Sequence, residues 1–118
     1  MGNKLDVILL EDLVNTPTTV NTDYETETVD ISFAEGNLSV QLDYDNGSAV
    51  DMEVSVAVSN DDITFVPISD TIHTISDASG TSFMDIDGSG AIFMRVQIIV
   101  SGGSIDLQKI SYRAKRRH

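Results

Sequence analysis

The chain has 118 residues, of which 41% are hydrophobic and 22% are charged, and it contains no cysteine. This length predicts one domain with its own hydrophobic core, and the ordinary composition argues against wholesale disorder. The lack of cysteine excludes disulfides, thiolate nucleophiles and zinc–thiolate sites. No apolar run approaches the roughly 18–20 residues of a membrane-spanning helix, so we expect no membrane partner.

Charge is distributed very unevenly along the chain. The last ten residues carry five of the seven basic residues and no acid, whereas all 19 acids lie in residues 1–108. With only Lys4 and Arg95 as cations, residues 1–108 have a net charge of −17, and the last ten residues bring the total to −12. An acidic body opposes general nucleic-acid binding, because phosphate contacts need cations over a broad face. The basic end indicates attachment to one kind of surface at one point.

The N-terminal segment, residues 1–28, differs in pattern from the rest of the chain. Residues 5–14 are consistent with an edge strand, and residues 15–28 are rich in Thr, Asn and acids, with a proline at position 17. This composition predicts an extended arm or a long connection. Two possibilities stay open: the arm packs on its own domain, or it reaches a neighbouring subunit.

Residues 29–112 are dominated by alternation of apolar and polar side chains. A period of two predicts antiparallel strands with one buried and one solvated face. Turn signals rich in Gly, Asn and Asp separate these strands, among them residues 45–48 and 101–103. Strands are expected at 29–33, 38–44, 52–58, 63–68, 71–76, 81–86, 91–100 and 104–114.

The last of these strands changes phase along its length. Ile105 and Leu107 share one phase, whereas Ile110, Tyr112 and Ala114 share the other. Such a change predicts a β-bulge near Gln108 and Lys109. About eight or nine short strands without a helix predict an all-β antiparallel sandwich, jelly-roll or immunoglobulin-like, over residues 29–114. Residues 115–118 are then expected to form a free basic tip.

The sequence offers little for catalysis. His73 lies in an alternating strand pattern, and the other histidine is the terminal residue, His118. No serine lies in a nucleophile elbow, and the paired glycines are typical of turns rather than of a phosphate cradle. We therefore predict a protein without enzymatic activity or cofactor.

Acidic loops raise the question of calcium. Carboxylates cluster at 43–46, 61–62 and 85–87, but none follows the twelve-residue calcium-loop pattern. In an acidic chain such clusters are expected from solubility alone, so no metal site is predicted. Arg95 stands alone in a strong strand, which favours an ion pair with an acid on the adjacent strand over a partner contact.

One longer segment goes beyond a generic strand pattern. Residues 54–68, Val-Ser-Val-Ala-Val-Ser-Asn-Asp-Asp-Ile-Thr-Phe-Val-Pro-Ile, combine a strand, a Ser-Asn-Asp turn, an aromatic residue and a short strand. This unit resembles small β-sandwich proteins of tailed-phage virions, although those often have Gly and Trp where this chain has Asp62 and Phe65. Independently, Phe65 is expected to fold back over the turn as a core aromatic. Flanking segments fit the same resemblance, which covers residues 27–114: 29–32, 38–42, 93–97 and 101–107.

The resemblance implies a virion structural protein, such as a capsid decoration protein, a connector or a tail component. Its partners would be other virion proteins or further copies of the chain, bound through extended termini. The basic end itself allows a merely solvated tail, docking onto an acidic neighbour, or contact with nucleic acid. The alternative function is a carbohydrate- or ligand-binding module, for which Tyr24, Tyr44, Phe93 and Tyr112 are the candidate platform aromatics. The candidate partner-binding residues are Lys109, Arg113, Lys115, Arg116 and Arg117.

Overall fold

A computed structural model describes residues 6–32, 34, 37–87 and 91–117. These residues form an antiparallel sheet of nine strands, with one short 3₁₀ turn, η1 (Ser69–Thr71), and no α-helix among them. The all-β prediction is therefore confirmed. The strands are β1 (Asp6–Val14), β2 (Thr18–Val20), β3 (Tyr24–Glu25), β4 (Val29–Asp30), β5 (Asn37–Ser59), β6 (Val66–Pro67), β7 (His73–Ile75), β8 (Gly80–Asp87) and β9 (Phe93–Arg117).

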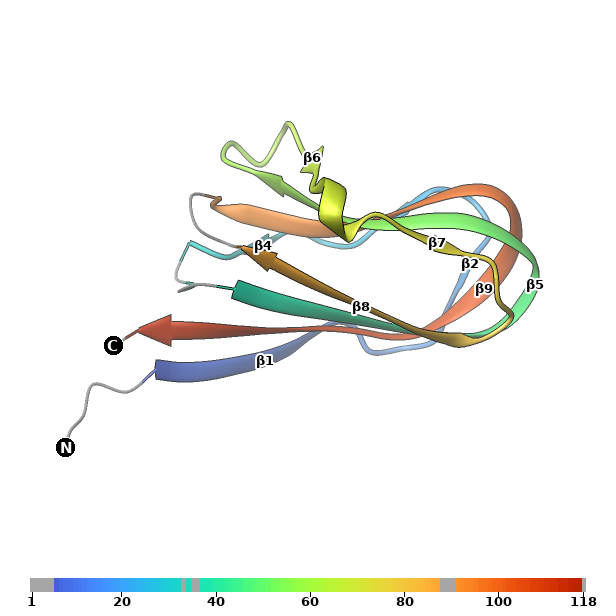
Figure 1. The fold of residues 1–118 in the computed structure, drawn as a ribbon, viewed down its shortest axis with the longest axis horizontal. Helices are drawn as coiled ribbons and strands as arrows, with labels where there is room; N and C mark the ends of the chain where they lie inside the picture. Colours follow the sequence, from blue (N-terminus) through green and yellow to red (C-terminus); the bar gives the residue numbers. More distant parts are fainter. Residues whose placement is uncertain (1–5, 33, 35–36, 88–90, 118) are drawn as a thin grey trace.

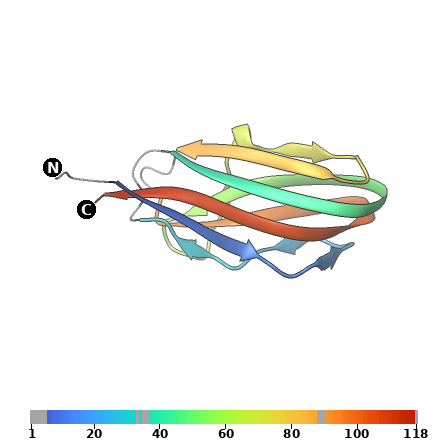
Figure 2. The same ribbon diagram turned by 90° about the horizontal axis from the view of Figure 1, so that it is seen from below.

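Two long strands, β5 and β9, form the frame of the molecule. They pair with each other from Ser39↔Arg113 to Ser59↔Phe93, and both curve over at one end of the molecule (Figure 1). The sheet thereby folds onto itself, and its two halves face each other as the layers of a sandwich (Figure 2).

The terminal layer consists of β8, residues 37–45 of β5, residues 104–117 of β9, and β1 with β2. The opposite layer consists of β6 and β7, residues 51–59 of β5, residues 93–102 of β9, and β3 with β4. Each layer therefore has two edges, formed by its short outer strands.

The bend corrects two sequence-based expectations. Residues 45–48 and 101–103 were expected to be turns between separate strands, but they curve the continuous strands β5 and β9. Register shifts between Asp45 and Asp51 accompany positive φ values of 54° at Asn46 and 51° at Ala49. Asn tolerates this left-handed region, which also supports turns, so its presence does not distinguish a bend from a hairpin.

The core lies between the layers and follows the alternation of the sequence. Leu38, Val40 and Leu42 of β5 belong to the same buried hydrophobic cluster as Val96 and Ile98 of β9. Burial of each such aliphatic side chain contributes about 1.5–3 kcal/mol relative to exposure, which holds the two layers together.

The predicted β-bulge is confirmed in β9. Asp43 pairs with Lys109 and Tyr44 pairs with Leu107, so Gln108 is the additional residue. After the bulge, Ile110, Tyr112 and Ala114 are the residues of β9 that face the core, and all three are buried.

Two buried threonines complete the hydrogen bonding of the opposite layer where its edge strands are interrupted. Between β6 and β7, the hydroxyl of Thr71 accepts a hydrogen bond from the N–H of Val56 at 2.9 Å. Between β3 and β4, the hydroxyl of Thr26 accepts one from the N–H of Val96 at 3.0 Å. Because Val56 and Val96 are paired, the two side chains act at the same level of the sheet.

The first and last described residues, Asp6 and Arg117, lie side by side at one end of the molecule (Figure 1). β1 pairs with β9 from Asp6↔Arg117 to Val14↔Ile110, so the described part of the N-terminal segment packs on its own domain. The expectation of a free tip is wrong for residues 115–117, whose backbone belongs to β9, while His118 lies outside the described residues. Within the part of the chain described, no helix is long and apolar enough to cross a membrane.

Candidate binding surfaces

The outer side of the terminal layer forms the first candidate surface. Strand register places Phe83 opposite Gln41, and Gln41 opposite Ser111, in one row across β8, β5 and β9. The next row contains Asp85, Ser39 and Arg113. We call these six residues the Arg113 face.

The Arg113 face is hollowed and carries an exposed aromatic ring. Two shallow hollows, of about 170 and 240 Å³, share Ser39 and Arg113 in their linings. The side chain of Phe83 lines the larger hollow, and this residue is 53% exposed. An exposed aromatic beside a cation is the kind of surface on which binding energy is commonly concentrated.

The predicted basic residues do not share one environment. The ammonium of Lys109 lies 3.5 Å from the carboxylate of Asp12, so its charge is partly compensated. Arg113 is exposed and forms no ion pair with any side chain that the structure describes. The side chains of Lys115, Arg116 and Arg117 lie outside the described residues, and their role stays a prediction.

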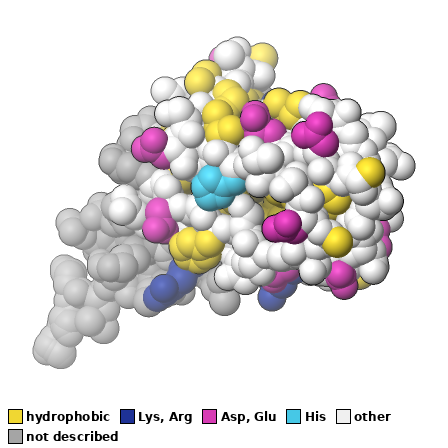
Figure 3. Space-filling model, turned by 45° about the vertical axis from the view of Figure 1, so that its right-hand side comes forward, with side chains coloured by type: hydrophobic (Ala, Val, Ile, Leu, Met, Phe, Trp, Pro, Cys, Tyr) yellow, Lys and Arg dark blue, Asp and Glu magenta, His cyan; other side chains and the backbone are white. Residues whose placement is uncertain are grey.

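Most of the charged residues that the structure describes are acidic. In the view of Figure 3, the visible Lys and Arg side chains lie at the lower margin, whereas Asp and Glu side chains are scattered over the rest of that face. Arg113 therefore presents positive charge on a molecule with a net charge of −12.

A second candidate surface lies between the edges of the two layers. It is an open groove of about 380 Å³, formed where the corner after β1 passes beside β3. Apolar, hydroxyl and carboxylate side chains share the lining, which has no cation. We call it the acidic groove; its residues are Leu13, Val14, Asn15, Thr16, Thr18, Tyr24, Glu25 and Glu27.

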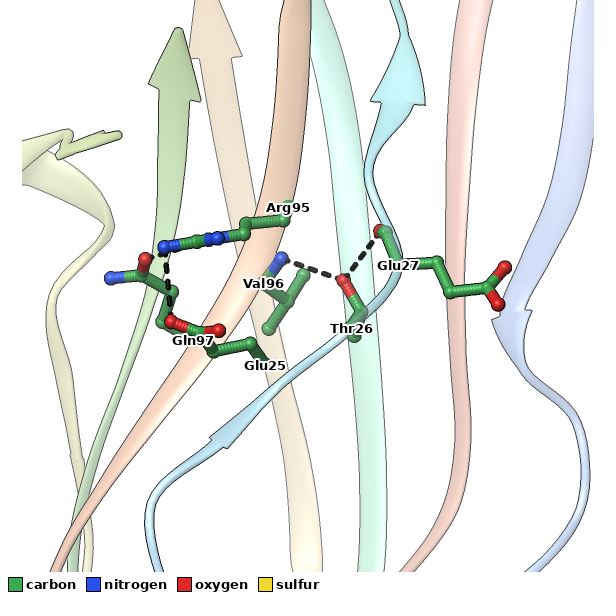
Figure 4. Close-up of polar contacts among 6 residues, drawn as sticks. All are labelled: Glu25, Thr26, Glu27, Arg95, Val96 and Gln97. Carbon is green, nitrogen blue, oxygen red and sulfur yellow. Dashed lines mark hydrogen bonds and ion pairs between the residues drawn. The ribbon is translucent and has the colours of Figure 1, made fainter. Parts of the chain in front are cut away.

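The two glutamates of the acidic groove differ in their partners. Glu25 forms an ion pair of 3.0 Å with Arg95, which confirms the predicted ion pair on an adjacent strand. Glu27 extends to the other side of its segment, away from Arg95 and Gln97 (Figure 4), and forms no ion pair with any described side chain. Burial and the nearby Glu27 raise the pKa of Tyr24 in the same groove.

Arg95 serves as a clamp on the outside of the opposite layer. Its Nε donates a hydrogen bond to Gln97 Oε1 at 2.9 Å, and its guanidinium lies 4.0 Å from the centre of the Phe65 ring. Phe65 is partly buried beneath this cation rather than inserted between the layers. The cluster ties β3 and the loop after β5 to β9.

The remaining polar candidates have structural partners. The His73 ring nitrogen Nδ1 lies 3.0 Å from the Ser82 hydroxyl, which joins β7 to β8. The carboxylate of Asp61 accepts hydrogen bonds from the backbone of Ile63 and Thr64, both at 2.9 Å. Among the residues described, no three His, Cys, Asp or Glu side chains are grouped as a metal ion would need.

Phe83 is the site residue that the sequence-based search missed. It lies out of phase with Met84 and Ile86, which are buried, so alternation alone could have placed it on the outer face. Of the candidate platform aromatics, Tyr44 and Tyr112 are buried, as their phase indicates.

No protein-family model and no curated protein matches the sequence. Among solved structures, the chain is similar to the SPBc2 prophage-derived protein YomS, with a TM-score of 0.63 and 10% identity over 98% of both chains. It is similar to a chain of the T13 IBDV viral particle, with a TM-score of 0.61 and 11% identity over 95% of this chain and 31% of that one. A family 16 carbohydrate-binding module has a TM-score of 0.54 and 9% identity over 80% and 73% of the two chains.

These likenesses establish the fold. The prophage-derived protein matches over its whole length, whereas the viral-particle chain contains this fold in about a third of its length. The same sandwich therefore occurs as a free-standing protein and as part of a larger chain, and function has to be argued from the surface.

Proposed function

We propose that this chain is a structural component of a virus particle of the tailed-phage type. The observation that carries the proposal is the terminal ribbon, β1 paired with the end of β9, which brings the basic C-terminal residues to one end of an acidic body. The likeness to a prophage-derived protein and to a viral-particle chain supports it at the level of the fold. The protein acts without catalysis, by binding neighbouring subunits.

The paired ribbon changes how attachment through the termini works. The backbone of residues 115–117 is already paired with β1, so binding does not require a free tail to become ordered. A particle with repeated subunits adds many modest contacts through effective concentration. The partners are then other virion proteins or further copies of this chain, and the location is the virion.

Analysis of purified particles tests this function. We expect the chain to copurify with intact particles and to be visible in their density by electron microscopy, with a copy number that distinguishes a lattice from a ring. Its absence from every particle fraction of a producing culture would falsify the assignment.

Charge reversal tests the role of the ribbon better than truncation. Removal of residues 115–117 would also remove the pairing partners of β1, so loss of binding would not be specific. The triple substitution Lys115→Glu, Arg116→Glu and Arg117→Glu keeps the backbone, and we expect it to abolish incorporation into particles. Circular dichroism verifies the fold, and normal incorporation of a folded variant would exclude attachment through these charges.

A second candidate function is carbohydrate binding, and the exposed ring of Phe83 specifically favours it. Stacking on an aromatic ring with polar neighbours such as Gln41 and Arg113 is a common way to hold a sugar. The likeness to a carbohydrate-binding module is consistent with this fold having such a use. A glycan array that binds the protein but not its Phe83→Ala variant would support this function, and an array without hits would rule it out.

A further inference from the structure

We propose that the Arg113 face of one copy binds the acidic groove of the next copy. The inference rests on the proposed structural function and identifies the two surfaces of a contact between subunits. Both surfaces are built from described residues, and they lie on different parts of the molecule: one on the outer side of the terminal layer, the other between the layer edges.

The Arg113 face carries a cation that has no described carboxylate partner. Of the cations with described side chains, Arg95 and Lys109 have carboxylate partners and Arg113 does not. Ser39 and Ser111 flank Arg113 with small side chains, and the hollow between them leaves the guanidinium accessible. Asp85 lines the adjoining hollow and forms no ion pair with Arg113, so the described neighbours leave the positive charge available.

The acidic groove carries the complementary anion, Glu27. Glu27 lies at the groove without a described cationic partner, whereas Glu25 is already paired with Arg95. Leu13 and Tyr24 are partly buried in the same lining and supply apolar surface. A ring such as that of Phe83 can pack on them while the guanidinium meets the carboxylate of Glu27.

Charge complementarity identifies the occupant as a second copy. The rest of the acidic molecule repels Glu27 and its surroundings, so an approaching copy is attracted where it presents Arg113. Arg and aromatic residues also dominate the binding energy of protein interfaces. Because the two surfaces differ, the contact is heterologous, and repetition generates a ring or an open array rather than a closed dimer.

Complementary charge reversals test the contact. We expect sedimentation of the purified wild-type protein to show concentration-dependent association, and Arg113→Glu or Glu27→Lys alone to weaken it at least tenfold. A mixture of the two variants should associate again, because each reversed surface meets its reversed partner and each native surface meets a native one. Glu53→Lys, at an exposed position on β5 in the opposite layer, is the matched control for Glu27→Lys, and it should leave association within about twofold, as expected for an exposed charge outside the contact.

Cysteine trapping detects the contact even when association is weak. The chain contains no cysteine, so Ser111→Cys on the Arg113 face and Thr16→Cys at the groove introduce single thiols. We expect an equimolar mixture to form the mixed disulfide in clear excess over the twofold ratio to each symmetric one that random pairing gives. Symmetric and mixed products in the statistical ratio, or a mixture of charge variants that stays monomeric, would overturn the inference.

These outcomes separate the contact from the function. A chain that is present in particles but shows statistical trapping keeps the proposed function and loses this contact. A chain that associates as expected but is absent from every particle loses the proposed function and keeps the contact.

Discussion

At the scale of the residue, Gly103 shows what the bend of the sheet demands. Its φ is +76°, and a Cβ at this position would lie 2.3 Å from the carbonyl oxygen of Ala49. The curved strands β5 and β9 approach so closely here that only a hydrogen fits. Gly102, one residue earlier, has no such neighbour, since the nearest atom to its Cβ would be the Asp51 Cβ at 3.8 Å.

Replacement of these adjacent glycines therefore has unequal effects. We expect Gly103→Ala to reduce the free energy of unfolding by about 2 kcal/mol or more, because backbone strain at positive φ adds to the clash. Gly102→Ala should change it by less than about 1 kcal/mol, within the range of ordinary surface changes. Urea denaturation of both variants measures this difference, and equal losses would show that the bend can relax.

Carboxylates held by hydrogen bonds determine the response to acid. The backbone amides of Thr64 and Ile63 and the hydroxyl of Ser59 lower the pKa of Asp61. The hydroxyl of Thr19 and the amide of Asn46 lower the pKa of Asp106 in the same way. Each folded pKa lies below the unfolded value of about 3.9, so the contribution is complete above that pH.

We therefore expect the free energy of unfolding to fall as the pH drops below about 4 and through the folded pKa values. Thermal unfolding between neutral and strongly acidic pH measures this decline. Asp61→Asn should flatten the acid side of the profile, whereas Ser69→Ala, an exposed polar substitution outside this network, should leave it unchanged. Profiles of the same slope in all three proteins would contradict the assignment.

At the scale of the element, the edges of the opposite layer depend on two hydroxyl groups. Thr71 is fully buried, and its hydroxyl also donates a hydrogen bond to the carbonyl oxygen of Ile68 at 2.7 Å. Thr71→Val keeps the shape but leaves the N–H of Val56 without its acceptor. A buried, unsatisfied donor costs about 1–3 kcal/mol.

We expect that loss in the free energy of unfolding for Thr71→Val, and a similar one for Thr26→Val at the other edge. Thr→Ser at each position keeps the hydroxyl and should cost less. Hydrogen exchange at Val56 and Val96 gives a local measurement, and protection that survives in the Val variants would show that another acceptor replaces the threonine.

The pattern of the elements was predictable from the sequence, but their connection was not. The phase change at Gln108 indicated a bulge because side chains must return to the core within a single strand. Residues 45–48 and 101–103 carry turn signals, yet local chemistry is the same in a hairpin and in a bend. The pairing of β5 with β9 over their full length depends on tertiary contacts, which strand periodicity does not encode.

The candidate surfaces were likewise predictable from the sequence only in part. Composition marked Arg113 as part of the basic end, and alternation could place it and Phe83 on outer faces. The acidic groove joins Leu13 to Glu27, and the clamp joins Glu25 to Arg95 across most of the chain. Leu13 and Glu27 meet because β1 and β3 both pair with β9, and Glu25 reaches Arg95 because β3 pairs with β9.

At the scale of the whole molecule, a net charge of −12 destabilises the folded state through repulsion between like charges, whereas the basic end favours association with acidic surfaces. Both effects are electrostatic, but salt changes them in opposite directions. Screening relieves repulsion within the acidic body, and it also weakens attraction between Arg113 and Glu27 of two copies. Ions at about 0.15 M reduce the screening length to about 8 Å, which is short compared with the molecule but long compared with an ion pair.

Increasing sodium chloride should therefore raise the midpoint of thermal unfolding and lower self-association of the same protein. Differential scanning calorimetry and sedimentation on one dilution series measure the two quantities together. Arg113→Glu removes the attractive contact, so its association should no longer fall with salt while its midpoint still rises. If association of the wild-type protein instead grows with salt, apolar surface such as Phe83 and Ile99 drives it and the charge pair does not.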